Sequence, residues 1–432
     1  MEMAAYDVVL FYVYAPLTDL PALRSAFRAL ATEQQLTGRL LIAAEGVNGT
    51  VAAEAGTDRM RTFQREFVRL VPAARDMQWK RSSSDGAGGG SPFIDMKISV
   101  VKELVGWGFE RKAAGIVGAG GGASKNVGHL TPREFHAKLV AAAAGGDGDV
   151  VVMDMRNAQE SALGHFENAL LPKAKNMPDL GAFLREQAPT IEGKTVLMYC
   201  TGGIRCEKAS LFLDVLSGGK AEHIYQLEGG IHKYLEEFSE APDCQFLGKN
   251  FVFDKRGYDG VGRTDKNGTG LCQSCQAREP HLTGCAVCVV CRFQLLLCRK
   301  CLPHNGGEHF CFSHESLSEC YSMFRIPTMR KAELARRIAL LKEKESELLP
   351  EGRSGRNRRR TIRNCYTTME KALLAKAGLD EDCDGGEGRR GAAVAAFCRS
   401  SGKLLSECKG DCWGFFGQGA MMEKLNNSET KT

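Results

Sequence analysis

Residues 194–210 read KTVLMYCTGGIRCEKAS, and the fold is predicted outward from this stretch. Residues 195–199 are a short apolar run with the composition of a buried strand, and residues 206–216 form a helix-like run. The loop between them is Cys200-Thr201-Gly202-Gly203-Ile204-Arg205. A tight glycine-containing turn from a strand into a helix gathers backbone N–H groups at the positive end of that helix. The sequence therefore predicts a pocket that stabilises a negative charge at Cys200.

Cys200 is the candidate catalytic residue of this loop. The N–H groups and the helix dipole favour a thiolate over a thiol, which lowers the pKa of the cysteine. Gly202 and Gly203 let the backbone curl around the sulfur without a Cβ clash, and Arg205 adds a positive charge. The alternative is an inert buried cysteine at a strand end, which is a common arrangement.

Three segments together resemble the rhodanese superfamily. The loop resembles its active-site loop, and DMRN (154–157) with GHFENA (164–169), and LEGGI (227–231), match two other parts of that fold in order. The string CTGGIRCEKAS (200–210) is similar to the branch that includes the bacterial tRNA uridine-34 hydroxylases. Cysteine phosphatases place five residues between Cys and Arg, whereas four separate Cys200 from Arg205. The shorter loop favours a sulfur-sized group over a phosphate.

The totals describe an ordinary globular chain with an unusual distribution of cysteines. Its 432 residues predict roughly two to four domains, and the net charge of +5 leaves room only for a local nucleic-acid surface. Seventeen cysteines are present; none precedes Cys200, and eight lie between Cys272 and Cys311. This clustering favours metal ligation in a reducing compartment over disulfides.

The N-terminal sequence does not resemble a signal peptide. MEMAAYDVVLFYVY (1–14) has no basic residue before its apolar run, and no apolar run in the chain has the length of a membrane span. We expect a cytoplasmic protein that does not contact a membrane. A nuclear location is the alternative if the arginine run of the tail acts as an address.

We predict a multidomain α/β protein with five regions. They are a ferredoxin-like α+β domain (1–110), a glycine-rich linker (111–129), a rhodanese-like parallel α/β domain (130–244), a small cysteine-rich zinc-type module (245–325), and a helical, partly disordered basic tail (326–432).

The first region has the alternation β-α-β-β-α-β of a ferredoxin-like fold. Strands are expected at 6–14, 38–44, 50–53 and 94–104, helices at 20–33 and 58–70, a tight turn at the Asn-Gly pair of EGVNGT (45–50), and a flexible insertion at 82–91. The region resembles the acylphosphatase-like domain of the hydroxylase branch. It has no candidate nucleophile, so we expect a scaffold, with Lys80, Arg81 and Lys97 as a possible RNA-binding surface.

In the second domain, the ends of parallel strands are expected to meet at one pocket. A helix from Thr131 to Ala144, a strand at 150–153 that ends in Asp154, and a helix at 177–186 precede the Cys200 strand. Asp154 therefore could face the Cys200 pocket. The favoured alternative is that Asp154 and Arg156 form a structural pair that braces the loop. His165 is expected to be a structural imidazole.

Cys206 lies six positions after Cys200 and has two interpretations. It could resolve an oxidised or persulfidated Cys200 by forming a disulfide. Because it falls near the first turn of the expected helix, its side chain could instead point away from the loop.

The cysteine-rich module contains two CxxC pairs, Cys272/Cys275 and Cys298/Cys301, at a separation that fits a structural Zn²⁺ site. Partly free thiols are the alternative. The resemblance implies matching cysteines at 272, 275, 291, 298, 301 and 311, with a shifted spacing between Cys285 and Cys291 and with Cys288 as an additional cysteine. Beyond the two pairs, the candidate ligands are Cys285, Cys291 and Cys311.

The tail has an amphipathic helical pattern over 328–349 and then RSGRNRRRTIR (353–363), with six arginines and no acidic residue. Its interpretations are phosphate contacts with RNA, a nuclear address, or a solvated linker between helices. The candidate nucleic-acid-binding residues are Arg353, Arg356, Arg358, Arg359, Arg360 and Arg363. Cys398, Cys408 and Cys412 have no partner spacing typical of a metal site.

Three hypotheses for function follow. The resemblance implies a tRNA-modifying enzyme that converts the wobble uridine to 5-hydroxyuridine in an oxygen-dependent reaction through Cys200. The residues alone also fit a sulfurtransferase that carries a Cys200 persulfide from a small sulfur donor to an acceptor. A non-catalytic RNA or protein adaptor is the third. No flavin, haem or nucleotide cofactor signature is visible, and the sequence leaves the oligomeric state open.

Overall fold

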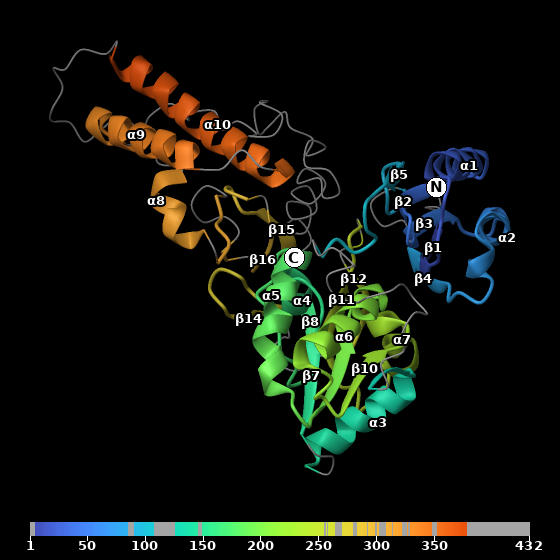
Figure 1. The fold of residues 1–432 in the computed structure, drawn as a ribbon. Helices are drawn as coiled ribbons and strands as arrows, with labels where there is room; N and C mark the ends of the chain where they lie inside the picture. The colour runs from blue at the N-terminus through green and yellow to red at the C-terminus, as the bar shows by residue number, and fades with distance from the viewer. Residues whose placement is uncertain are drawn as a thin grey trace, which may run out of the picture. The chain divides into compact units, whose positions relative to one another are not determined.

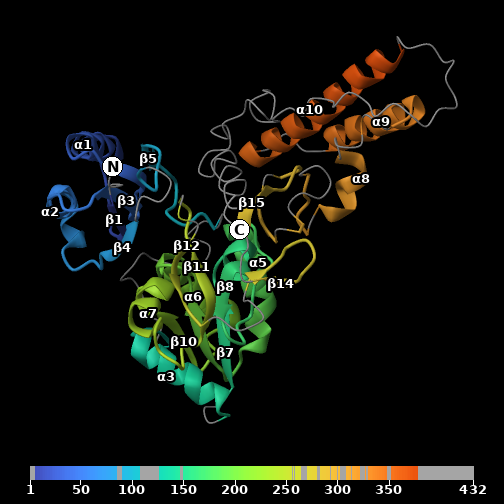
Figure 2. The same ribbon diagram turned by 180° about the vertical axis from the view of Figure 1, so that it is seen from behind.

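A computed structural model describes two compact units, Met1–Gly270 and Leu271–Thr432 (Figures 1 and 2). The described residues are 5–84, 90–107, 126–145, 149–254, 256, 258–263, 270–279, 283–291, 293–298, 300–301, 308–312, 314–321, 326, 329–347 and 352–377. Most of the predicted linker, Cys398, Cys408, Cys412 and the end of the tail lie outside these residues.

A five-stranded sheet opens the first unit, in the order β4-β1-β3-β2-β5. All its neighbouring pairs are antiparallel except β2 with β5. Its elements are β1 (Tyr6–Tyr14), α1 (Leu20–Glu33), β2 (Thr37–Ala43), β3 (Gly46–Glu54), α2 (Arg59–Leu70), a 3-10 turn (Pro72–Ala74), β4 (Lys80–Ser84) and β5 (Met96–Val100). The two helices pack through Phe27, Phe63 and Phe67 onto the Phe11 face of the sheet.

Two local predictions for this domain were wrong. The Asn48-Gly49 pair is not a turn, because it lies inside β3 and pairs with β1 and β2. Gly49 is instead needed for packing, since a Cβ there would come 2.6 Å from Leu40 and 3.0 Å from Phe11. The first residues of the expected insertion at 82–91 belong to β4, which adds an edge strand beside β1.

The second domain of this unit is built on a parallel sheet, as predicted, which has four strands in the order β6-β10-β9-β7. Its elements are β6 (Val127–Leu130), α3 (Pro132–Ala143), β7 (Val150–Asp154), α4 (Ala158–Leu163), β8 (Gly164–Phe166), α5 (Met177–Gln187), a 3-10 turn (Ala188–Thr190), β9 (Thr195–Tyr199), α6 (Ile204–Ser217), β10 (His223–Leu227) and α7 (Gly230–Phe238). The capping box of Thr131 and Glu134 begins α3 at the expected residue.

The parallel sheet is covered on both faces. Along β9, Val196 and Met198 pack with α5 and α6, whereas Leu197 and Tyr199 pack with α3 and α7. The alternation of strand side chains therefore places Cys200, the next residue, on the α5–α6 side. A small sheet in the order β12-β11-β8 follows, with β11 (Phe246–Phe251) and β12 (Tyr258–Val261).

The two domains of this unit are joined by a buried ion pair. Lys208 on α6 donates to Glu45 at 2.8 Å and to Glu103 at 3.3 Å, and all but 7% of Lys208 is buried. The Glu45 carboxylate also accepts the Leu104 N–H at 2.7 Å, and Trp107 packs on the same helix. The segment after β5 is thus fixed against α6.

The second unit contains short strands followed by helices. They are β13 (Gly270–Leu271), at the boundary, β14 (Arg278–Glu279), β15 (Thr283–Val287), β16 (Gln294–Leu297), a 3-10 turn (Glu315–Leu317), α8 (Ser318–Tyr321), α9 (Lys331–Glu347) and α10 (Gly352–Ala377). The helix predicted at 328–349 is α9. The arginine run 353–363 lies inside α10, so one of its three interpretations, a linker between helices, is wrong. No helix in the described part of the chain is long and apolar enough to cross a membrane.

Candidate active site and metal sites

The Cys200 loop wraps the cysteine sulfur at the junction of β9 and α6. The Gly203 N–H donates to Cys200 Sγ at 3.1 Å, and Gly203 has a φ of +100°, which favours glycine. The LEGGI segment holds the loop from the other side, because Ile231 and His232 donate their N–H groups to the carbonyls of Cys200 and Thr201. A Cβ on Gly230 would lie 2.5 Å from the Cys200 carbonyl oxygen.

Cys200 is a thiolate at neutral pH despite being fully buried. Burial alone would raise its pKa, but the Cys206 thiol donates to its sulfur, the Arg205 charge is close, and the N–H groups of Arg205 and Gly203 point at it. Together they lower the pKa of Cys200 to about 5. Burial and the neighbouring thiolate raise the pKa of Cys206, so Cys206 stays protonated and acts as the donor.

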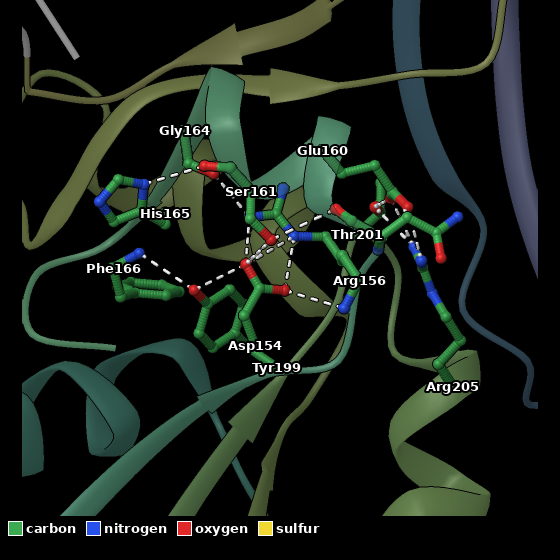
Figure 3. Close-up of polar contacts among 11 residues, drawn as sticks. Asp154, Arg156, Glu160, Ser161, Gly164, His165, Phe166, Tyr199, Thr201 and Arg205 are labelled. Carbon is green, nitrogen blue, oxygen red and sulfur yellow. Dashed lines mark hydrogen bonds and ion pairs between the residues drawn. The ribbon is translucent and has the colours of Figure 1, made fainter. Parts of the chain in front are cut away.

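Arg205 is held in place by a buried carboxylate. Glu160, which is fully buried on α4, accepts from the Arg205 guanidinium at 2.7 and 2.8 Å (Figure 3). Thr201 Oγ1 donates to Glu160 at 3.1 Å and accepts from Arg205 at 3.1 Å, so the three side chains are all hydrogen-bonded to one another. Burial raises the pKa of Glu160, but Arg205 reverses this and holds it below its ordinary value. The positive charge expected from Arg205 is therefore largely balanced within the protein.

Asp154 lies in a second buried network. Arg156 forms a two-pronged ion pair with it, and Ser161 and Tyr199 each donate to Asp154 Oδ2 at 2.9 Å (Figure 3). Arg156 Nη2, which donates to Asp154 Oδ2, also donates to the Gly164 carbonyl at 2.6 Å. These contacts fit the interpretation that Asp154 and Arg156 are a structural pair, and they link the ends of β7 and β9 to the segment from Ser161 to Gly164. His165 is buried as well, with Nδ1 2.9 Å from the Ser161 carbonyl.

Three side chains of the first domain cover the Cys200 loop. A Cβ on Gly202 would lie 2.8 Å from Leu10 Cδ2 and 3.8 Å from Lys80 Cδ, and a Cβ on Gly203 would lie 2.9 Å from the Tyr12 hydroxyl. The two loop glycines thus make room for β1 and β4 as well as for the sulfur.

Glu207, on the first turn of α6, ties this cover to the second domain. It accepts from Tyr12 at 3.0 Å, lies 3.1 Å from His129, and accepts from Gln226 at 3.4 Å. Burial raises the pKa of Tyr12, and Glu207 and the Cys200 thiolate raise it further, so the phenol remains a donor.

Two groups of side chains in the second unit could hold a metal ion. The first is Cys272, Cys275, Cys298 and Cys301, and the second is Cys288, Cys291, Cys311 and His314. In each group the ligand atoms all lie within 4.8 Å of one another. Cys275 and Cys298 are 3.9 Å apart at sulfur, and Cys291 and Cys311 are 3.8 Å apart. A tetrahedral zinc–thiolate site, with bonds of about 2.3 Å, separates its sulfurs by about 3.8 Å, so both groups fit zinc.

The two groups interleave along the chain. The ligands come in four pairs with two residues between the members, and the first and third pairs form one group while the second and fourth form the other. The hairpin of β15 and β16 connects them, with Ala286 opposite Leu295. Cys288, which appeared additional in the sequence, and His314 complete the second group. The side chain of Cys285 lies outside the described residues.

Comparisons with known proteins match both domains of the first unit. A family model of the UPF0176 acylphosphatase-like domain matches residues 6–104, and a model of the rhodanese-like domain matches residues 137–237. The tRNA uridine(34) hydroxylase of Brucella anthropi is 34% identical over 277 residues, which cover 64% of this chain and 82% of that protein. The protein of the same name from Brucella ovis is 33% identical with the same coverage. The chain belongs to the tRNA uridine(34) hydroxylase family.

Membership of the tRNA uridine(34) hydroxylase family confirms the resemblance drawn from CTGGIRCEKAS and the predicted fold class. Among solved structures, the As-Sb reductase from Leishmania major aligns over 29% of this chain and 87% of its own, at 14% identity and a TM-score of 0.25. A similarity of this size carries no functional argument.

Within this member of the family, the structure brings Cys200, Arg205 and Cys206 together and keeps Asp154 and Arg156 in a separate network. Sequence analysis missed Glu160, Tyr12 and Glu207. The one available signal was Asn157-x-x-Glu160, a capping-box spacing that places a carboxylate at a helix start.

The arginine run of the tail takes part in the contact between the two tail helices. Arg363 pairs with Glu345 of α9 at 2.5 Å, which joins the two tail helices. Arg360 is exposed, and the side chains of Arg353, Arg356 and Arg358 lie outside the described residues.

Proposed function

We propose that this protein is a tRNA-modifying enzyme that hydroxylates uridine 34, with Cys200 as its catalytic residue. The observation that carries the proposal is the alignment with relatives named tRNA uridine(34) hydroxylase, which spans 82% of their length. In this reaction a hydroxyl group replaces the hydrogen on C5 of the uracil: one atom of molecular oxygen enters the base, and the other leaves as water with two electrons and two protons from a reductant. The substrate is tRNA, and the expected location is therefore the cytoplasm.

The site supports a reactive thiolate in this role. At pH 7 a cysteine with a pKa of about 5 is almost fully ionised, so it needs no separate general base. The Gly203 N–H and the Cys206 thiol both donate to Cys200 Sγ and thereby orient its lone pairs. The pair of Glu160 and Arg205 keeps the loop in one conformation, so that the sulfur is pre-positioned for the substrate.

Cys200 is fully buried beneath Leu10, Tyr12 and Lys80, so a nucleotide reaches the sulfur only when the first domain shifts far enough to admit a base between these side chains and the loop. We propose that tRNA binding opens this cover. The arginines of α10 remain a candidate phosphate-binding surface for the tRNA, since Arg360 is exposed.

Zinc is proposed at both interleaved groups. Four thiolates, or three thiolates and one imidazole, form closed sites without an open position, so the ions would be structural and take no part in the reaction. They would replace the apolar core that such short strands do not provide.

A sulfurtransferase is the second candidate, because a low-pKa thiolate ringed by N–H donors also suits a persulfide. Nucleoside mass spectrometry of tRNA from cells that lack the protein distinguishes the two. We expect 5-hydroxyuridine or its derivatives to disappear and to return with the wild type or with Cys244→Ala, which changes another buried cysteine of the same domain.

Rescue should fail with Cys200→Ala, although this variant is expected to fold. If the modified nucleosides are present without the protein, the hydroxylase proposal is wrong, and transfer of sulfur from a labelled thiosulfate donor becomes the assay. Rescue by Cys200→Ala would remove the cysteine from the mechanism.

A further inference from the structure

Lys80, the first residue of β4, is buried without a counter-ion of its own. It is 2% exposed, and lysine is rarely buried unless its ammonium is paired. Among the residues that the structure describes, no carboxylate or carbonyl accepts a hydrogen bond from its Nζ. The ammonium lies over the Tyr12 ring, whose centroid is 4.6 Å away.

The side chain crosses the loop that holds the catalytic sulfur. Lys80 Cδ is 3.8 Å from the position of a Cβ on Gly202, and the Tyr12 ring beneath the ammonium has its hydroxyl against Gly203. The ammonium is close enough to Cys200 for the thiolate to raise the pKa of Lys80, although burial outweighs this and lowers it to about 8. Lys80 is therefore charged at pH 7, with its donors unused.

The other groups around Lys80 are already engaged. Glu207 has three partners, Glu228 accepts from Gln78, and Lys233 pairs with Glu236. Arg205 is occupied by Glu160. Lys80 thus offers N–H donors that face the Cys200 loop and have no acceptor within the protein.

We propose that Lys80 is a substrate-binding residue of the Cys200 site, whose ammonium donates hydrogen bonds to an acceptor oxygen of the group presented to the sulfur. Given the proposed function, on which this identification of the substrate rests, the acceptor is a carbonyl oxygen of uracil. A neutral carbonyl suits the site better than a phosphate, because a phosphate beside Lys80 would also be repelled by the negative charges of the Cys200 thiolate, Glu207 and Glu228. The catalytic site is then shared between the two domains, with the sulfur from one and the donor from the other.

Two alkylating reagents of nearly equal size test whether the Lys80 ammonium lies close to a molecule that reacts with the Cys200 sulfur. Iodoacetate carries a carboxylate and iodoacetamide a neutral amide, and opening of the cover affects both equally, so the ratio of their rates at Cys200 reports the local charge. In Lys80→Met, which keeps the length of the stem, we expect the iodoacetate-to-iodoacetamide ratio to fall about three- to tenfold. Lys80→Arg should keep a ratio close to that of the wild type.

Lys249→Met is the matched control. Lys249 also lies over a tyrosine ring, 4.2 Å from the Tyr258 centroid, but on β11 and outside the Cys200 loop. It should change neither the ratio nor the modified nucleosides. In the tRNA assay, Lys80→Met should lower 5-hydroxyuridine at least about tenfold, the usual effect of losing a charge-assisted hydrogen bond.

The two measurements separate the possible failures. An unchanged alkylation ratio in Lys80→Met overturns the inference whatever the tRNA shows. A lower ratio with a normal content of 5-hydroxyuridine shows that Lys80 is near the sulfur but does not bind the base, which also overturns it. If the wild type itself has no effect on tRNA nucleosides, the proposed function fails, and the ratio alone then decides whether Lys80 binds a substrate oxygen at Cys200.

Discussion

Cys200 ionises in a fully buried position because several donors replace the water that it loses. The pKa falls from 9.0 to about 5 although burial acts in the opposite direction. Because the folded-state pKa lies below the unfolded one, the thiolate contributes to stability above about pH 9, and this contribution is lost as the pH falls towards 5. The active form is therefore also the form that stabilises the loop.

The ionisation of Cys200 can be measured by alkylation with iodoacetamide as a function of pH. We expect the rate to stay level from pH 7 to about pH 6 and to fall by half near pH 5. Cys206→Ala removes one donor and should raise the midpoint by about one unit or more, whereas Cys206→Ser keeps a donor and should leave it low. The tryptic peptide 195–205 contains Cys200 without Cys206, so mass spectrometry resolves the two. A midpoint near pH 8.5 in the wild type would contradict the prediction.

At the scale of single residues, the sequence predicted the candidate nucleophile Cys200 and its loop, but not the side chains that contact the loop. Cys200, Gly203 and Arg205 lie within six residues, so local spacing was informative. Glu160 is separated from Arg205 by 45 positions and Tyr12 from Glu207 by 195, and no local pattern records such contacts. The neutralisation of Arg205 by Glu160 could be found only in the folded chain.

At the scale of elements, regular helices and strands were predicted better than their connections. The helix at 20–33 has the predicted bounds, since its apolar periodicity and the Asp19 cap define both ends. The turn expected at Asn48-Gly49 was wrong because tertiary packing against Leu40 and Phe11 selects that glycine. Residues 353–363 are helical, and Arg363, Tyr366 and Glu345 connect this helix to α9.

The interleaved cysteine groups lead to a prediction about metal content. We expect about two zinc ions per purified chain, because each of the two groups provides a complete set of four ligands. The β15–β16 hairpin carries ligands of the second group at its turn and leads into ligands of the first group. Loss of one ion should therefore weaken the other site, so we expect the Cys272→Ser and Cys288→Ser proteins each to contain less than one zinc ion per chain. Cys285→Ser should keep two.

Elemental analysis of the purified variants measures this directly, with unfolding on chelation as a second readout. Metal-free protein that keeps its fold would contradict the prediction. A fall in zinc for Cys285→Ser would make that residue a ligand.

At the scale of the molecule, the first domain supplies part of the catalytic site and is fixed to the second by a buried pair. Lys208→Met would remove the cation that faces Glu45, which is 6% exposed, and should cost about 3 kcal/mol of unfolding free energy. It should also speed the alkylation of Cys200 because the cover loosens. Lys220→Met breaks an exposed pair with Glu192 and should cost less than about 1 kcal/mol.

Urea denaturation and the alkylation rate check this prediction together. Equal stability of the Lys208 and Lys220 variants would show that the ion pair of Lys208 and Glu45 does not fix the two domains to each other. Faster alkylation without a loss of stability would point to local opening instead.

The interleaving of the cysteine pairs also affects the order in which the protein can be completed during synthesis. The first group lacks a full set of ligands until residue 301 has been added, and the second until residue 314 has. Each group takes its ligands from two pairs that lie on either side of a pair of the other group, so neither group can complete its four ligands from one local stretch. Both sites therefore remain incomplete through most of the translation of the module.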